Sequence, residues 1–172
     1  HVALVAIISP GPATLGIAGT SMASGRLLGL GLASGVSSGS LMWSTAAAFG
    51  LGAIMQANAW VFEFVRYAAV AYLLFLAFKS ARAALFPTEA TLAGVHPKSY
   101  SSAFWRGVML HLTNPKPILF FGSLFAIGVP QGASAATLAT VVLAVGLQSA
   151  LVFHLYAVIF SSGPVAGFYV RA

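Results

Sequence analysis

The sequence predicts an all-α integral membrane protein, a fold class indicated by its composition and by the length of its apolar runs. Of the 172 residues, 59% are hydrophobic and only 6% are charged, whereas about 25% of residues are charged in an ordinary soluble domain. So few charged side chains could not keep the surface of a soluble protein of this size in contact with water. Several apolar stretches also reach the roughly 20 residues that a helix needs to cross a bilayer. We therefore expect a multi-pass membrane protein.

The net charge of +6 fits the same interpretation. In a soluble protein such a basic balance would suggest nucleic-acid binding, but here Lys and Arg lie at the ends of apolar runs, where the positive-inside rule places them. The 172 residues contain no cysteine, which excludes disulfides, thiolate metal sites and a dithiol redox relay within them. No hydrolase, kinase or zinc-binding motif is present. We expect no enzymatic activity, no metal, no cofactor and no nucleic-acid partner.

Five apolar runs are expected to span the membrane as helices. They cover about residues 1–21, 27–55, 60–85, 103–129 and 133–160. The third contains Arg66 and Lys79, and it can span only if both side chains extend towards opposite interfaces. A sixth helix is expected to be cut off after the fifth.

Residues 87–102, from Pro87 to Ser102, form the hydrophilic linker between two expected halves. Residues 1–86 would be a first three-helix repeat, and residues 103–172 an incomplete second repeat with two helices. Three helices per half make the second half run through the membrane in the inverted sense. Placing the linker in the cytoplasm puts every basic residue except Arg66 and the mid-span Lys116 on the inner side, as the positive-inside rule demands.

Two of the expected spans are interrupted by a Pro-x-Pro pattern at corresponding places. The interruptions consist of Pro10, Gly11 and Pro12 in the first span and of Asn114, Pro115, Lys116 and Pro117 in the fourth. Each proline removes a backbone donor and clashes with the carbonyl four residues earlier, so both helices should open here. Freed backbone groups are tolerated in a membrane only against protein or a wet cavity. Paired interruptions in two halves point to a transporter's substrate site; the alternative is a pair of structural kinks.

Polar residues in these spans are the candidates for function. Lys116 lies near mid-span, where a lysine costs roughly 3 kcal/mol on insertion scales. We predict that its ammonium faces a solute carboxylate, with holding the break together as the alternative. Asn114 could bind solute or cap the second half-helix. His111 and His154, in the fourth and fifth spans, are candidates for proton coupling or ordinary packed residues.

Gly31, Gly35 and Gly39 recur every four residues in the second span. Small residues at this spacing let helix backbones approach closely in membranes, so we expect a packing stripe. A phosphate-binding loop is excluded because no Lys-Ser or Lys-Thr pair follows the glycines.

A larger motif set carries a family resemblance. It consists of Pro10-Gly11-Pro12, Gly25-Arg26-Leu27-Leu28-Gly29, Ala33-Ser34-Gly35, Gly39, Arg66, Ala71-Tyr72-Leu73, Arg82, Phe104, Gly107 and Asn114-Pro115-Lys116. In order and spacing these motifs resemble the LysE/RhtB family of bacterial amino-acid exporters, over nearly the whole chain. The resemblance implies six helices in two inverted halves, a multi-pass location in the bacterial inner membrane, and export of lysine, threonine, homoserine or similar solutes.

The chain departs from the family where many members carry a membrane-embedded acid, because it has Ser40 and Ser149 in those regions. A basic substrate would need an anionic partner in the cavity. We therefore expect export of a neutral amino acid, such as threonine, homoserine or a derivative, by alternating access. The expected partners are this solute and the bilayer, with a homodimer left open. The alternatives are a non-transporting structural or subunit-type membrane protein and a metal-cation exporter, for which the chain offers few ligands.

Overall fold

A computed structural model of the chain describes residues 11–51, 97–130 and 132–162, together with single positions before residue 11 and between residues 60 and 85. Most of the third expected span and of the 87–102 linker lies outside the described residues, as do Pro10 and residues 163–172. Within the described part the fold is all-helical, with five α-helices and no strand. They are α2 (Pro12–Ser24), α3 (Arg26–Ala46), α6 (Tyr100–Leu112), α7 (Pro115–Gly128) and α8 (Ala135–Phe160), and a π-helical segment, η1 (Ala47–Leu51), continues α3.

The helices begin at residues that cap them. Ser99 Oγ accepts a hydrogen bond from Ser102 N at 3.2 Å, so α6 begins at Tyr100, inside the segment expected to be linker. Ser134 caps α8 in the same way, accepting from Thr137 N at 3.2 Å. A Ser side chain at this position pairs one of the amides that a helix start leaves without an intrahelical partner.

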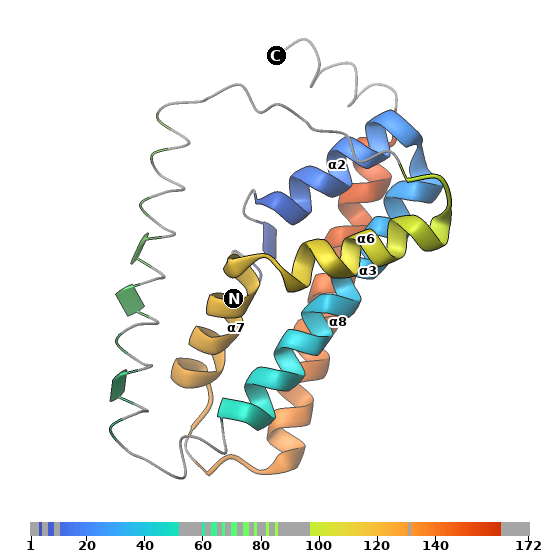
Figure 1. The fold of residues 1–172 in the computed structure, drawn as a ribbon. Coiled ribbons are helices and arrows are strands. Elements are labelled where there is room, and N and C mark those ends of the chain that lie inside the picture. Colours follow the sequence, from blue (N-terminus) through green and yellow to red (C-terminus); the bar gives the residue numbers. More distant parts are fainter. Residues whose placement is uncertain are drawn as a thin grey trace.

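The helix α3 lies at the centre of the described part, in contact with α2, α6 and α8. Figure 1 shows α3 and α8 side by side, with α2 and α6 across one half of this pair and α7 near the other half. Arg26 Nε donates to Ser161 Oγ at 3.0 Å, so the beginning of α3 meets the end of α8. The turn into α3 is made by Gly25, whose φ of +87° favours glycine.

The helices α3 and α6 approach so closely that their backbones touch. A Cβ at Gly35 would meet Phe104 O, and it would lie 2.9 Å from Val108 N. A Cβ at Gly107 would meet Leu32 O and lie 3.1 Å from Gly35 Cα. Neither position has room for a side chain, because each faces main-chain atoms of the other helix.

Buried apolar residues form two clusters that share α8. The α7 cluster contains Ala47, Ala48, Phe120, Phe121, Phe125, Val142 and Val145. The α2 cluster contains Ile7, Ala13, Ile17, Leu32, Ala33, Val36, Phe153 and Ala157. The two clusters lie at opposite ends of α3 and α8. The α7 cluster uses η1, which continues α3, and the first part of α8, whereas the α2 cluster uses the first part of α3 and the last part of α8.

Among the described helices, α8 alone is long and apolar enough to cross a bilayer by length and composition, with a mean hydropathy of 2.0. It coincides with the fifth expected span. Its outer face carries Leu143, Leu147, Leu151 and Leu155, each more than half exposed. Leucines four residues apart share one face of a helix, and this exposed stripe suits contact with lipid. The helix α7 is also apolar but has only 14 residues.

Candidate functional site

The first predicted interruption is the start of a new helix. Gly11 has an extended backbone with φ −168° and ψ 176°, and Pro12 is the first residue of α2. The Gly11 amide donates to Thr14 Oγ1 at 2.8 Å, and the same hydroxyl donates to Gly11 O at 3.0 Å. A proline without an amide suits the first helical position. Ile7 and Ile8, which precede the break, are also helical.

The second predicted interruption separates α6 from α7. Asn114 is extended, with ψ 122°, and its Oδ1 accepts from Lys116 N at 3.0 Å. A helix start leaves four amides without an intrahelical partner. In α7 two of these amides do not exist, because Pro115 and Pro117 occupy the positions, and Asn114 pairs a third. The start of α7 therefore leaves few amides without a partner, and Asn114 acts as its N-cap.

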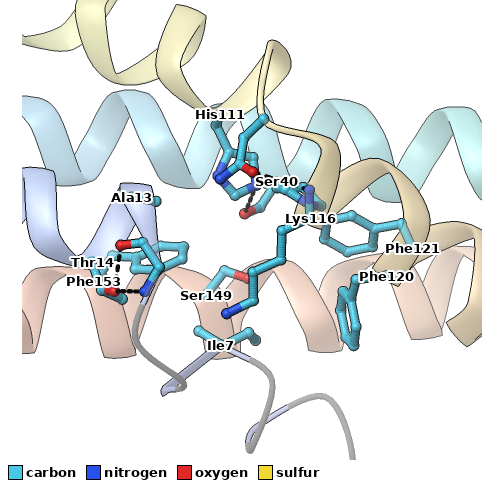
Figure 2. Close-up of a pocket in the computed structure, with 13 residues that line it drawn as sticks. Ile7, Ala13, Thr14, Ser40, His111, Lys116, Phe120, Phe121, Ser149 and Phe153 are labelled. Atoms are coloured by element: carbon cyan, nitrogen blue, oxygen red, sulfur yellow. Dashed lines mark hydrogen bonds between the residues drawn. The ribbon is translucent and has the colours of Figure 1, made fainter. Parts of the chain in front are cut away.

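The two breaks meet at one pocket, which Figure 2 shows. It contains about 430 Å³ of space that no atom fills, counting the part that opens to the outside. The breaks and α3, α6 and α8 all contribute to its lining. The lining residues are Ile7, Gly11, Ala13, Thr14, Ser40, His111, Asn114, Lys116, Pro117, Phe120, Phe121, Ser149 and Phe153.

Lys116 connects the two breaks. It belongs to the second, but its side chain extends to the first, where Nζ and Cδ lie 3.3 Å and 3.4 Å from the place of a Cβ on Gly11. A larger residue at position 11 would press on this side chain. Glycine at the first break thus leaves room for the lysine side chain that comes from the second break. This side chain is part of the pocket lining (Figure 2).

Buried polar side chains line the pocket from three helices. His111 is only 4% exposed, and its Nε2 lies 2.9 Å from Ser40 Oγ. His111 Nδ1 and Ser149 Oγ are buried and have no hydrogen-bond partner in the described part of the chain. Buried polar atoms are nearly always paired, with water or a ligand where protein does not serve. Both residues belong to the pocket lining, so the pocket has polar groups that the described protein leaves unpaired.

The pocket lies between the two apolar clusters. Along α3, Ser40 lies between Val36 of the α2 cluster and Ala47 of the α7 cluster. Along α8, Ser149 lies between Val145 and Phe153 in the same way. Apolar packing thus flanks the pocket towards both ends of these helices.

The structure separates the two histidines that the sequence suggested together. His154 is not part of the pocket lining. Its Nε2 lies 3.0 Å from Ser34 Oγ and its Nδ1 lies 2.7 Å from Ala150 O. Ser34 Oγ lies 3.1 Å from Tyr100 OH, so His154 takes part in a network that joins α8, α3 and α6.

The glycine stripe is also outside the pocket lining, because it faces α6. A Cβ at Gly31 would lie 3.0 Å from Ala103 Cβ, and one at Gly39 would lie 2.9 Å from His111 Cβ. Gly39 thus lies directly behind a pocket residue. Within the described residues no group of three or more His, Asp or Glu side chains could hold a metal ion.

Sequence reasoning did not find the walls of the pocket. The candidates that the sequence suggests do not include Phe120, Phe121, Phe153 or Thr14, which all line the pocket. Thr14 follows Gly11 at the spacing of a helix cap, which is a local signal. The phenylalanines have none, because an aromatic residue in an apolar helix looks the same whether it lines a pocket or faces lipid.

The helical fold, the exposed leucines of α8 and a pocket at two helix breaks define the class: a helical membrane protein with a pocket between its helices. Comparison with known proteins then gives the family. The family described as LysE type translocator matches residues 4–168, and the chain belongs to this family. The resemblance that the motifs indicated is confirmed.

Individual relatives are similar at moderate identity. The threonine efflux protein of Salmonella typhi is 29% identical over 135 residues, covering 77% of this chain and 66% of that protein. The threonine efflux protein of Escherichia coli is 28% identical over 128 residues, covering 73% and 62%. An uncharacterized membrane protein of Pseudomonas aeruginosa is 32% identical over 168 residues, covering 96% and 78%. The matched part thus spans less than two thirds of the threonine efflux proteins. No solved structure matches the chain.

Proposed function

We propose that this chain belongs to a secondary transporter that exports a small amino acid or a close derivative from the cytoplasm across the bacterial inner membrane. Membership of a translocator family and similarity to threonine efflux proteins support the reaction class. The observation that carries the proposal is the pocket at which Gly11 of one broken helix meets Lys116 of the other. Broken helices that meet at a central site are the usual substrate site of secondary transporters.

In this proposal the solute binds between the breaks, with its carboxylate against the Lys116 ammonium. On one side the solute would meet Gly11, at the break predicted from Pro10, Gly11 and Pro12, and on the other side the Asn114–Pro117 turn. The beginnings of α2 and α7 both lie at the pocket, and the positive end of a helix dipole favours an anionic group. A lysine in an apolar surrounding is costly, and a role in binding the solute carboxylate would offset that cost.

Transport would proceed by alternating access of two inverted three-helix halves. The α2 cluster and the α7 cluster would act as the two barriers, each opening while the other stays packed. Of the two histidines proposed for proton coupling, His111 is beside the substrate position. His154 would act only at a distance, through its contact with Ser34.

Lys116→Met tests the proposal, because it keeps the length of the side chain and removes its charge. We expect the initial rate of efflux of radiolabelled threonine to fall to the background of cells without the protein. Lys116→Arg keeps the charge but not the compact ammonium, and should retain partial rate. Lys98→Met is the matched control, since Lys98 is exposed and outside the pocket lining.

The rates are compared in cells with matched membrane levels of each variant. A normal rate and unchanged apparent affinity in Lys116→Met would show that the lysine serves only the structure. A host that resists toxic amino-acid analogues only when it expresses the protein would separate a transporter from a non-transporting membrane protein.

A further inference from the structure

Most of the surface that the pocket offers to a solute is apolar. Phe120 and Phe121 line it from α7, Phe153 lines it from α8, and Ile7 lines it from the helical residues before the first break. In the view of Figure 2, Phe120 and Phe121 lie on one side of the Lys116 side chain and Phe153 lies on the other. The part of a solute that extends beyond its charged groups therefore meets hydrocarbon.

The polar side chains among the lining residues mostly serve the protein itself. Thr14 Oγ1 accepts from the Gly11 amide at 2.8 Å and donates to Gly11 O at 3.0 Å. Ser40 Oγ lies 2.9 Å from His111 Nε2. Ser149 Oγ and His111 Nδ1 are unpaired in the described part of the chain, but both atoms are buried, so a solute does not reach them in this structure. A polar group on the side chain of the solute therefore finds few partners here.

The charged ends of an amino acid, in contrast, find partners at the second break. Lys116 brings a positive charge, and the beginning of α7 adds the positive end of a helix dipole. The side-chain amide of Asn114 belongs to the same break, where its Oδ1 accepts from the Lys116 amide. These groups suit the carboxylate of the solute.

The end of α6 lies at the same break and suits the ammonium group. In a continuous helix the carbonyls of His111 and Thr113 would accept from the amides of residues 115 and 117, but both of these residues are prolines and have no amide. Carbonyls at the end of a helix carry partial negative charge, which favours a cation. The second break thus accounts for both charged groups, and the side chain of the solute is left to the phenylalanine rings.

We propose that the preferred solute is an amino acid with an apolar side chain, such as valine or leucine, and that threonine and homoserine are carried with weaker apparent affinity. The charged groups bind at the second break, and the side chain lies against Phe120, Phe121 and Phe153. A hydroxyl group placed there loses its water without gaining a partner, whereas a methyl group in the same place loses nothing. This inference rests on the proposed export function and narrows its substrate class.

The test compares solutes of matched shape. L-Valine and L-threonine have nearly the same shape, as have L-leucine and L-asparagine, and all four carry the same charged groups. The full-length protein is purified and placed in liposomes, and counterflow of each labelled solute is measured over a range of concentrations, with protein-free liposomes as the background. We expect the half-saturating concentration to be at least about tenfold higher for threonine than for valine, because an apolar site discriminates against an added hydroxyl by roughly this factor or more. The ratio of asparagine to leucine should be larger, since a whole amide group is left without partners.

A variant connects this preference to the pocket. Ala13 lines the pocket from the first turn of α2, and Ala13→Ser adds one hydroxyl there. It should reduce the ratio between threonine and valine several-fold, because the solute hydroxyl gains a partner. Ala126→Ser is the matched control, since Ala126 is buried in α7 but is not part of the pocket lining; it should leave the ratio unchanged. Thermal unfolding in detergent checks that both variants are folded.

The outcomes separate this inference from the proposed function. If threonine is carried as well as valine, and asparagine as well as leucine, the apolar preference is wrong while export stands. If a folded Ala13→Ser variant keeps the original ratio, the assignment of the preference to this pocket is wrong. If none of the four solutes exchanges above the background, the proposed function itself fails.

Discussion

Replacing Gly35 by alanine should separate α3 from α6 and destabilise the protein. The added Cβ would meet Phe104 O, which belongs to the main chain of α6. A carbon and a carbonyl oxygen normally approach no closer than about 3.3 Å, and the added atom would lie well inside this limit. A backbone oxygen inside a helix cannot turn away as a flexible side chain can. The two helices must therefore move apart, or both must bend.

The size of the effect follows from what the contact supports. Forcing an extra carbon into a tightly packed site costs typically about 1–3 kcal/mol. Gly107 faces the same crossing from the other side, with its Cβ position against Leu32 O, so the shift cannot be absorbed there. We expect Gly35→Ala to lie at the upper end of that range, and Gly35→Leu to abolish folding.

Stability is measured as the free energy of unfolding in mixed detergent micelles titrated with dodecyl sulfate. Gly122→Ala, in α7, is the matched control because a Cβ there has nothing within 4 Å. The control should be neutral, or more stable by up to about 1 kcal/mol, since alanine is the better helix former. If Gly35→Ala is as stable as Gly122→Ala, the close approach of the two backbones does not support the fold.

Three further changes test the breaks and the orientation. Asn114→Ala should lower the free energy of unfolding by about 1 kcal/mol, and Asn114→Ser should restore most of it, because the cap of α7 is lost and regained. Pro12→Ala and Pro117→Ala should each slow efflux at matched expression, since the restored amide lets backbone hydrogen bonds form across the break; unchanged rates would make the breaks incidental. In intact cells an impermeant thiol reagent should label a cysteine at Ala135 and not one at Ser99, and the opposite pattern would reverse the predicted orientation.

The sequence predicted the breaks well because proline acts locally. Pro12 and Pro115 each stand at the first position of a helix, and Asn114 caps as its type suggests. The start of α6 was placed too late, because Ser99 belongs to a polar stretch that resembled linker rather than cap. The glycine stripe was likewise predicted from spacing alone. Its contact with Gly107 was not predicted, since nothing near Gly35 specifies which helix will cross it.

The chemistry of the pocket depended on contacts between distant segments. His111 and His154 are both single histidines in apolar helices, and nothing in their local sequence separates them. Their surroundings differ because His111 meets Ser40 beside the pocket, whereas His154 meets Ser34 outside it. The same limit applied to Ser149, whose buried hydroxyl became informative only when the packing left it without a partner.

The prolines of the second break also determine what kind of motion the protein can use. Pro115 and Pro117 have no amide to donate, so α6 and α7 cannot join into one fully hydrogen-bonded helix in any state of the protein. The interruption of the backbone hydrogen bonds between α6 and α7 is therefore permanent. If the proposed alternating access moves this junction, each half-helix would turn about Thr113 and Asn114 with its internal hydrogen bonds intact. Amide hydrogen exchange within α7 should accordingly stay slow and unchanged when solute is added, even if the angle between the two half-helices changes.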